Sequence, residues 1–107
     1  GIYGISIDNI LVYIGKSENM LRRLSEHIVG IKTQSERKYE IMAEAKFYHF
    51  SVNFKVLYYA KSTSAPELKE ELGAMEGQYI RTYLPPLNRF IPLESDWHHT
   101  KENPEFR

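Results

Sequence analysis

The first fifteen residues, GIYGISIDNILVYIG (residues 1–15), decide the fold. Residues 1–7 are apolar and rich in isoleucine, Asp8-Asn9 is a turn signal, and residues 10–15 are apolar again. Two short apolar runs separated by such a turn predict an antiparallel β-hairpin. We expect the helix that follows to pack on this hairpin.

That helix is predicted over residues 19–30 by apolar residues that recur at helical spacing. Ser17 or Asn19 is suited to cap its start, and Gly30 is a natural stop. The stripe expected to pack on the hairpin consists of Leu21, Leu24, Ile28 and Ile31. A polar connection follows, and then a second helix is predicted over residues 35–49.

Residues 50–60 alternate with a period of two, which predicts a third strand. Its expected buried face consists of Phe50, Val52, Phe54, Val56, Tyr58 and Ala60.

A third helix is predicted from Ser64, which has capping-box spacing to Glu67, with Pro66 in the first turn. Pro85-Pro86 is expected to end it. Its expected buried stripe consists of Leu68, Leu72, Met75, Tyr79 and Tyr83. The whole pattern predicts an α+β fold in which helices flank a small three-stranded antiparallel sheet. We expect one domain over residues 1–90 and a C-terminal tail over 91–107 that packs on the domain or frays from it.

Composition restricts the class of protein. The chain has 107 residues and 42% hydrophobic residues, which is enough for one compact core. It has no cysteine, which excludes a disulfide framework and a thiolate metal site. No apolar run has the length of a membrane span and no secretory leader is recognisable, so we expect a soluble cytoplasmic domain.

The charges balance, with 14 Lys and Arg against 14 Asp and Glu. Tight nucleic-acid binders are usually basic, but affinity depends on where the charges lie. Residues 16–46 are richer in Lys and Arg than the rest of the chain, so a basic face on a neutral domain is compatible with the sequence. Binding to DNA through such a face would be weak, and this predicts an additional DNA-binding domain or a homo-oligomer.

Six positions together suggest a family. Gly1-Ile2-Tyr3 and Tyr13-Ile14-Gly15 are followed by Arg23 ten residues after Tyr13, and by His27 four residues later. Glu76 then lies within the third predicted helix and Asn88 follows its exit. In type, order and spacing these residues resemble the catalytic domain of the GIY-YIG nucleases, over residues 1 to about 90. The resemblance implies a Mg²⁺-dependent DNA endonuclease, with Mn²⁺ able to substitute, that cuts one strand per active site and leaves a 5′-phosphate and a 3′-hydroxyl.

Glu76 is the candidate metal ligand. Magnesium prefers oxygen ligands, keeps several waters and often takes a single protein carboxylate. A carboxylate on a rigid helix, at the edge of an apolar stripe, is well placed to hold such an ion. The alternative is a solvated helix glutamate, like Glu70 or Glu71.

Arg23 is the candidate for stabilising charge on the phosphate, because a planar guanidinium donates several hydrogen bonds to phosphate oxygens. Its spacing of four residues from His27 places both on one helix face, whereas Arg22 points elsewhere and is a candidate for pairing with Glu26 or for contacting backbone phosphate. The alternative for Arg23 is a surface arginine paired with Glu26 or Glu18.

Tyr3 and Tyr13 are implied by the resemblance to act on the attacking water, Tyr3 as general base and Tyr13 as the residue that positions water or phosphate. Both must then face the same side of the sheet. A regular two-residue loop at Asp8-Asn9 pairs Gly4 with Tyr13 and separates the tyrosines, whereas a three-residue loop pairs Tyr3 with Tyr13. A nuclease therefore needs a bulged or odd-length hairpin; in the alternative, the two tyrosines only pack on a small sheet.

The remaining polar candidates have less specific roles. His27 is a candidate for phosphate contact or for a proton relay, and Asn88 for hydrogen bonds to backbone that shape the site, or else for a simple turn. Lys16 and Asn88 are, with Arg22, the candidate DNA-binding residues. His49, His98 and His99 form no convincing metal site, and Trp97 is expected to anchor the tail.

Two other functions remain open on the sequence alone. A domain of the same fold that binds DNA without cutting it is one, although the complete set of catalytic positions argues against it. A protein-interaction module is the other, and it needs a sizeable exposed apolar patch.

Overall fold

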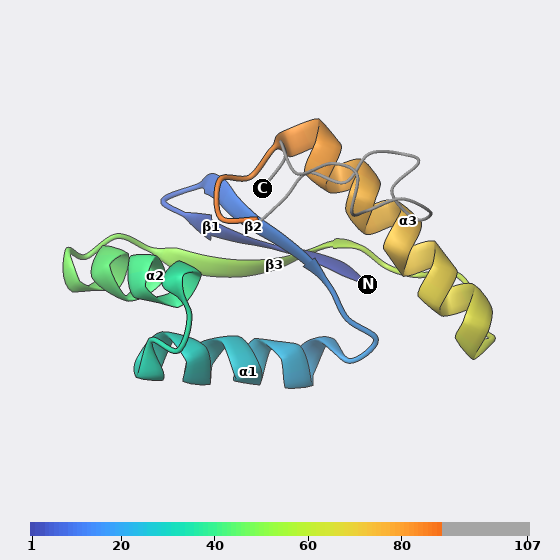
Figure 1. Ribbon diagram of the computed structural model, residues 1–107, viewed down its shortest axis with the longest axis horizontal. Coiled ribbons are helices and arrows are strands. Elements are labelled where there is room, and N and C mark those ends of the chain that lie inside the picture. The colour runs from blue at the N-terminus through green and yellow to red at the C-terminus, as the bar shows by residue number, and fades with distance from the viewer. Residues whose placement is uncertain (89–107) are drawn as a thin grey trace.

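One antiparallel sheet with strand order β2-β1-β3 lies between helices, in a computed structural model that describes residues 1–88. The strands are β1 (Ile2–Ile7), β2 (Ile10–Lys16) and β3 (Val52–Tyr58). The helices are α1 (Met20–Thr33), α2 (Arg37–Phe47) and α3 (Ala65–Tyr83). In Figure 1, α1 and α2 lie on one side of the sheet and α3 on the other. The predicted α+β fold is confirmed; the expected tail, with Trp97, His98 and His99, lies outside the described residues.

The hairpin is bulged, as a site built from both tyrosines requires. Asp8 and Asn9 have φ values of 49° and 70°, and positive φ at both central residues is typical of the type I′ turn. Ile7 pairs with Ile10, but the register shifts after Ile5, which pairs with Tyr13. The extra residue in β2 returns Tyr13 to the face of Tyr3. Tyr3 pairs with Gly15, so of the two alternatives the bulged hairpin occurs, and the three-residue loop that would pair the two tyrosines directly does not.

Each face of the sheet buries its own cluster. Toward α3, Ile2 and Ile14 pack with Leu72 and Ile80. Toward α1 and α2, the buried residues are Tyr3, Ile5, Tyr39 and Met42. Alternate residues of β1 therefore belong to different clusters, as the period of two requires.

The predicted start of α1 is confirmed, and its predicted end is wrong. The Asn19 side chain accepts a hydrogen bond from the Arg22 backbone N–H at 3.0 Å, as an N-cap does. The helix passes Gly30 and ends at Thr33, with Gln34 in the left-handed conformation. Gly30 is instead a point of close approach, since a Cβ there would lie 2.4 Å from the ring of Tyr39.

The apolar stripe expected to pack α1 on the hairpin is also wrong in part. Leu21 is 77% exposed and Ile28 is 46% exposed, while His27 and Gly30 are the buried residues of this helix. The periodicity was real, but the face that contacts the sheet carries the polar side chain of His27. Apolar periodicity alone cannot detect such a face.

The third strand starts two residues later than predicted and changes face near its end. Val52 and Phe54 pack with the cluster of Tyr3 and Tyr39, whereas Tyr58 packs with the cluster of Ile2. A register shift separates the pairs Tyr3–Val56 and Ile2–Tyr58. This irregularity overturns the expectation that Phe50 through Ala60 share one buried face.

Helix α3 begins after Ser64 as predicted, but without the predicted capping box. The Ser64 side chain makes no capping hydrogen bond, and its Oγ is buried without a partner among residues 1–88. Leu84, in the left-handed conformation, ends the helix just before Pro85. Tyr83, expected in the buried stripe, is 57% exposed. Within the part of the chain that the structure describes, no helix is long and apolar enough to cross a membrane.

Candidate active site

The hydroxyl of Tyr3 is the centre of a hydrogen-bonded group on the α1 side of the sheet. It lies 2.6 Å from Nε2 of His27 and accepts a hydrogen bond from Nε of Arg23 at 3.2 Å. Arg23 and His27 project from one face of α1, as their spacing predicted. Tyr3 is completely buried, so this group is held in one arrangement by the core around it.

A glycine makes the position of the Tyr3 ring possible. Gly15 lies opposite Tyr3 on β2, and a Cβ at Gly15 would lie 2.3 Å from the Tyr3 hydroxyl oxygen. The ring of Tyr3 therefore crosses the space where a side chain would be. Gly15 and Tyr3 fit each other, which gives a structural reason for a glycine at this place.

Tyr13 lies beside Tyr3, with their ring centroids 6.3 Å apart. Its hydroxyl accepts from Nζ of Lys38 at 3.5 Å, and the same Nζ lies 4.6 Å from the centre of the Tyr13 ring. Lys38 is mostly buried, with 15% of its side chain exposed, and it also pairs with Glu36 at 3.4 Å. A buried ammonium group over an aromatic face is a favourable cation–π contact.

The two adjacent arginines of α1 differ in surroundings. Arg22 is 77% exposed and pairs with Glu26 at 3.5 Å. Arg23 also pairs with Glu26, through Nη1 at 3.0 Å, but its Nε is turned to Tyr3. The alternative of a merely paired surface arginine therefore applies to Arg22 and describes only part of Arg23.

Glu76 contributes a carboxylate from α3. It lies 3.9 Å from Nζ of Lys16 and 26% of its side chain is exposed. Burial raises the pKa of this carboxyl, while the charges of Lys16 and Arg23 oppose the rise. The guanidinium of Arg23 thus acts both on Tyr3 and on Glu76.

No group of three or more acidic, histidine or cysteine side chains with the arrangement of a metal site occurs among residues 1–88. A magnesium ion, however, is often held by one carboxylate and several waters. The donor set around Glu76, one carboxylate that is half-buried at the edge of the site, fits an ion of that kind.

Asn88 is fixed to the backbone of β2. Its Oδ1 accepts from the N–H of Ile14 at 2.9 Å, and its Nδ2 donates to the carbonyl of Ile14 at 2.8 Å. Leu87 donates its backbone N–H to the carbonyl of Val12 at 2.8 Å. Asn88 therefore holds the segment after α3 against the strand that carries Tyr13 and Gly15.

The electrostatics of the group follow from its burial. Burial raises the pKa of Tyr3, and the hydrogen bond from Arg23 opposes this rise. Burial, followed by the charges of Arg23 and Lys38, lowers the pKa of His27 to about 4. At neutral pH the imidazole is therefore uncharged and the phenol of Tyr3 is protonated.

Two residues of this site were missed by the sequence analysis. Besides Lys38, Tyr39 places its hydroxyl 2.7 Å from Nδ1 of His27. Tyr39 and Met42 are three residues apart on one face of α2, which marks Tyr39 as a core residue. Nothing local in the sequence links it to a histidine on another helix.

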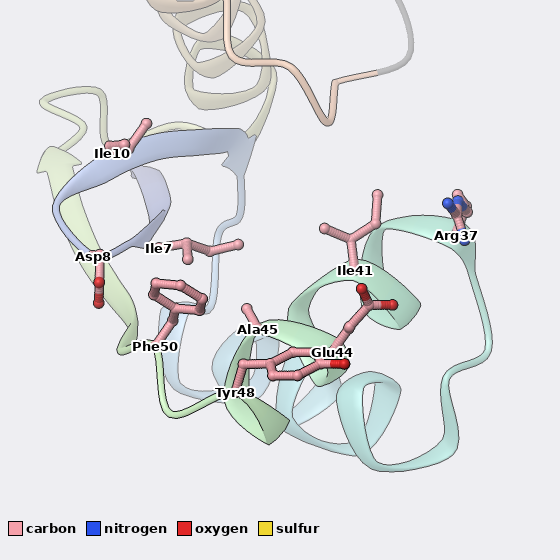
Figure 2. Close-up of a pocket in the computed structure, with 9 residues that line it drawn as sticks. All are labelled: Ile7, Asp8, Ile10, Arg37, Ile41, Glu44, Ala45, Tyr48 and Phe50. Atoms are coloured by element: carbon pink, nitrogen blue, oxygen red, sulfur yellow. The ribbon is translucent and has the colours of Figure 1, made fainter.

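A separate hollow lies between the hairpin turn and α2. It has a volume of about 370 Å³, and Figure 2 shows Ile7, Phe50 and Tyr48 beside it, with Asp8 at the turn. None of the candidate catalytic residues lines it. A second hollow, of about 550 Å³, lies between α1 and α2 and is lined by both Arg23 and Tyr39. The hydrogen-bonded group around Tyr3 thus adjoins the space between the two helices.

Comparison with known proteins gives two matches. A family model described as the GIY-YIG catalytic domain matches residues 1–89. Endonuclease II of Enterobacteria phage T4 is 30% identical over 99 residues, which cover 81% of this chain and 70% of that protein. No solved structure matches significantly.

Proposed function

The chain belongs to the GIY-YIG family of catalytic domains, and we propose that it is a metal-dependent endonuclease that hydrolyses DNA, one strand per active site. The observation that supports this most strongly is the Tyr3 oxygen, which lies within hydrogen-bond distance of both Arg23 and His27 on the face shared with Tyr13. A phosphodiesterase needs a residue that takes the proton of water beside a cation that stabilises phosphate. The similarity to a phage endonuclease points to the same class of reaction.

Glu76 is the proposed metal ligand. A bound magnesium ion would supply electrostatic stabilisation to the phosphate oxygens and to the departing oxygen. The raised pKa of Glu76 means that protons compete with the metal more strongly than at an exposed carboxylate. We therefore expect metal affinity to fall as the pH drops through this raised pKa.

Arg23 is the proposed phosphate ligand. A guanidinium has five N–H donors, of which Nε serves Tyr3 and one on Nη1 serves Glu26. The remaining donors suit the oxygens of a phosphate that develops charge during in-line attack. Lys38, which sequence analysis did not single out, adds a second positive charge beside Tyr13.

Tyr3 is the proposed general base. As the water oxygen attacks phosphorus, the bond to the 3′ oxygen breaks, which leaves a 5′-phosphate and a 3′-hydroxyl. The water proton passes to the Tyr3 oxygen. Because Tyr3 carries its own proton at neutral pH, that proton must pass first, or at the same time, to Nε2 of His27, 2.6 Å away. The departing 3′ oxygen takes up a proton from solvent. Lys16, Arg22 and Asn88 are proposed to lie along the bound DNA.

The test is plasmid nicking by the wild-type domain with magnesium, with manganese and with EDTA, beside Glu76→Ala and Glu70→Ala. Glu70 is exposed on the same helix and serves as the matched control. We expect nicking that requires metal, is lost in Glu76→Ala and persists in Glu70→Ala. A folded wild type that binds DNA with a steep salt dependence but never nicks it would instead support a binding module without catalysis.

A further inference from the structure

His27 lies between two tyrosine hydroxyls that come from different parts of the chain. Its Nε2 is 2.6 Å from the hydroxyl of Tyr3 on β1, and its Nδ1 is 2.7 Å from the hydroxyl of Tyr39 on α2. His27 is 2% exposed, so both contacts are inside the protein. Tyr39 has no part in the function proposed above, although it contacts the residue that receives the proton of Tyr3.

Only one of the two tyrosines can donate its proton to His27. A neutral imidazole has one N–H donor and one acceptor nitrogen. If Nε2 accepts from Tyr3, Nδ1 must donate to the oxygen of Tyr39; if Nδ1 accepts from Tyr39, Nε2 must donate to Tyr3. The tyrosine that does not donate to the imidazole needs another acceptor, because a buried hydroxyl is seldom left without one for its proton.

The surroundings of the two hydroxyls decide between these directions. Tyr3 is completely buried, and its other partner, Nε of Arg23, can only donate. Among residues 1–88, Nε2 of His27 is therefore the acceptor for the Tyr3 proton. Tyr39 lines the hollow of about 550 Å³ between α1 and α2, where water can accept its proton. Tyr3 is thus the donor to Nε2, and Nδ1 carries the proton of the imidazole.

The hollow gives Tyr39 access to water. Its wall includes three exposed polar residues, Thr33, Ser35 and Glu36. Space and polar groups of this kind allow water to enter. The ring of Tyr39 lies against Gly30, where a Cβ would be 2.4 Å from a ring carbon, so the ring is held between the two helices. Tyr39 therefore separates the buried imidazole from the water in the hollow.

We propose that Tyr39 is a positioning residue that accepts the Nδ1–H of His27, which keeps Nε2 free to take the proton of Tyr3, and that a proton then leaves through the Tyr39 hydroxyl to water in the hollow. In this transfer the O–H bond of Tyr3 breaks as an N–H bond forms at Nε2. The Nδ1 proton passes to the oxygen of Tyr39, and the proton of Tyr39 passes to water. The phenolate left at Tyr3 takes the proton of the attacking water.

The reverse transfer restores the starting tautomer once the product has left. One proton is then taken up from the hollow through Tyr39, and Tyr3 gives up one proton to solvent in the emptied site. The inference rests on the proposed role of Tyr3 as the base.

The charges around His27 favour passage of the proton over its storage on the imidazole. Nζ of Lys38 lies 5.1 Å from the centre of the Tyr39 ring, and Nε of Arg23 is bonded to the Tyr3 oxygen. Burial, together with these two cations, keeps the pKa of His27 low. An imidazolium is disfavoured there, so a proton that arrives at Nε2 is matched by the loss of the proton at Nδ1.

The first experiment is a long-range ¹⁵N–¹H correlation spectrum of the ¹⁵N-histidine-labelled wild type without metal or DNA at neutral pH. His27 is assigned with His27→Gln. We expect the chemical shift of an N–H nitrogen at Nδ1 and of an unprotonated nitrogen at Nε2. The opposite pattern overturns the proposal, and this measurement does not depend on activity. A domain with the expected tautomer that never nicks DNA would instead refute the proposed function.

The second experiment compares Tyr39→Phe with Tyr79→Phe in the same spectrum, in DNA binding and in single-turnover nicking. Tyr39→Phe keeps the ring against Gly30 and removes only the acceptor of the Nδ1 proton. We expect His27 to shift toward the tautomer protonated at Nε2, and nicking to slow by about tenfold with unchanged affinity for DNA. Tyr79→Phe removes a hydrogen bond to the carbonyl of Leu57 in the other cluster and should leave all three readouts as in the wild type. If Tyr39→Phe leaves tautomer and rate unchanged, the proposal is wrong; if it fails to fold, the wild-type spectrum still decides.

The third experiment tests the passage of the proton through Tyr39. In the wild type several protons move when Tyr3 becomes the base, whereas in Tyr39→Phe the chain of transfers ends at His27. We therefore expect single-turnover nicking to slow more in heavy water for the wild type than for Tyr39→Phe. Equal solvent isotope effects for the two proteins would overturn the passage through Tyr39.

Discussion

The two buried faces of the sheet differ in the chemistry they hold. The face toward α3 is an apolar contact of Ile2 and Ile14 with Leu72 and Ile80. The face toward α1 and α2 buries Tyr3 together with a neutral imidazole. A single strand, β1, supplies both faces by alternation, so a core residue and the proposed general base are neighbours on the same strand.

Burial therefore has a different main effect on each face of the sheet. On the α3 face, burial removes apolar surface from water and stabilises the fold. On the α1 face, burial shifts pKa values, upward for Tyr3 and downward for His27. Substitutions on the two faces should therefore have separable effects.

The largest effect is expected from one substitution on each face. Tyr3→Phe removes only a hydroxyl, so we expect nicking to fall by about 10²–10⁴-fold while the fold is kept. Leu72→Ala leaves a cavity at a residue that is 3% exposed and should lower the free energy of unfolding by about 2–5 kcal/mol. Urea denaturation and nicking rates per folded molecule measure both. A Tyr3→Phe variant that nicks as fast as the wild type would contradict the proposed catalytic role of the α1 face.

The next effect is a pH dependence of stability that comes from His27 on the α1 face. The pKa of His27 is lowered to about 4 in the folded protein, so the unfolded chain binds more protons between pH 4 and 6.5. Stability from this group is present above pH 6.5 and is lost as the pH falls through about 4, by roughly 3 kcal/mol in full.

Urea denaturation of the wild type, His27→Gln and His49→Gln between pH 7 and pH 3.5 measures this loss. His49 is exposed and serves as the control. His27→Gln should lose less stability over the range than the wild type, whereas His49→Gln should follow the wild type. Equal pH slopes for all three would contradict a buried neutral His27.

A smaller effect is expected from alanine substitutions at two glycines of the hairpin, one on each face of the sheet. Gly15→Ala places a methyl group against the Tyr3 hydroxyl and should slow nicking by about tenfold or more, because the base is displaced. Gly4→Ala meets the flexible ends of Leu11 and Leu57 on the α3 side, at 2.6 and 3.1 Å. We expect it to lower the free energy of unfolding by about 1–3 kcal/mol while the folded fraction nicks normally. Identical nicking rates for the two variants would show that the faces are not independent.

The smallest effect concerns the outer surface of α1. Arg22→Ala removes one exposed ion pair, which should change stability by less than about 1 kcal/mol. If DNA lies along this side, the salt slope of DNA binding should decrease by about one. Binding titrations at several salt concentrations measure the slope, with exposed Lys69→Ala on α3 as the matched control. A decrease in Lys69→Ala and none in Arg22→Ala would place the DNA on the other face.

The sequence predicted the hairpin, and the nuclease hypothesis required it to be either bulged or odd in length; the bulged form is the one that occurs. Asp8-Asn9 indicated a turn but left a two-residue and a three-residue loop open, and a site with both tyrosines on one face required an extra residue in one place or the other. The position of that residue, between the partners Leu11 and Tyr13, was not predictable, because the fit of the Tyr3 ring over Gly15 is a contact between strands. The turn residues alone carry no information about this contact between strands.

The errors have a common physical cause. Gly30 was interpreted as a helix stop and Leu21 as a buried residue, yet Gly30 admits the ring of Tyr39 and Leu21 is 77% exposed. Tyr39 and Lys38 reach the site only because α2 packs on α1. Propensity and periodicity describe one element at a time, whereas the face with the candidate catalytic residues depends on how two helices pack.

Asn88 has a consequence for how the sheet can grow. With its amide oxygen and nitrogen bound to the N–H and carbonyl of Ile14, one side chain imitates a peptide unit of a neighbouring strand. Together with the hydrogen bond from Leu87 to Val12, it occupies the outer edge of β2 along residues 12–14. A strand from another molecule could not pair with β2 along these residues. To extend the sheet it would have to pair with β3, the outer strand on the opposite side.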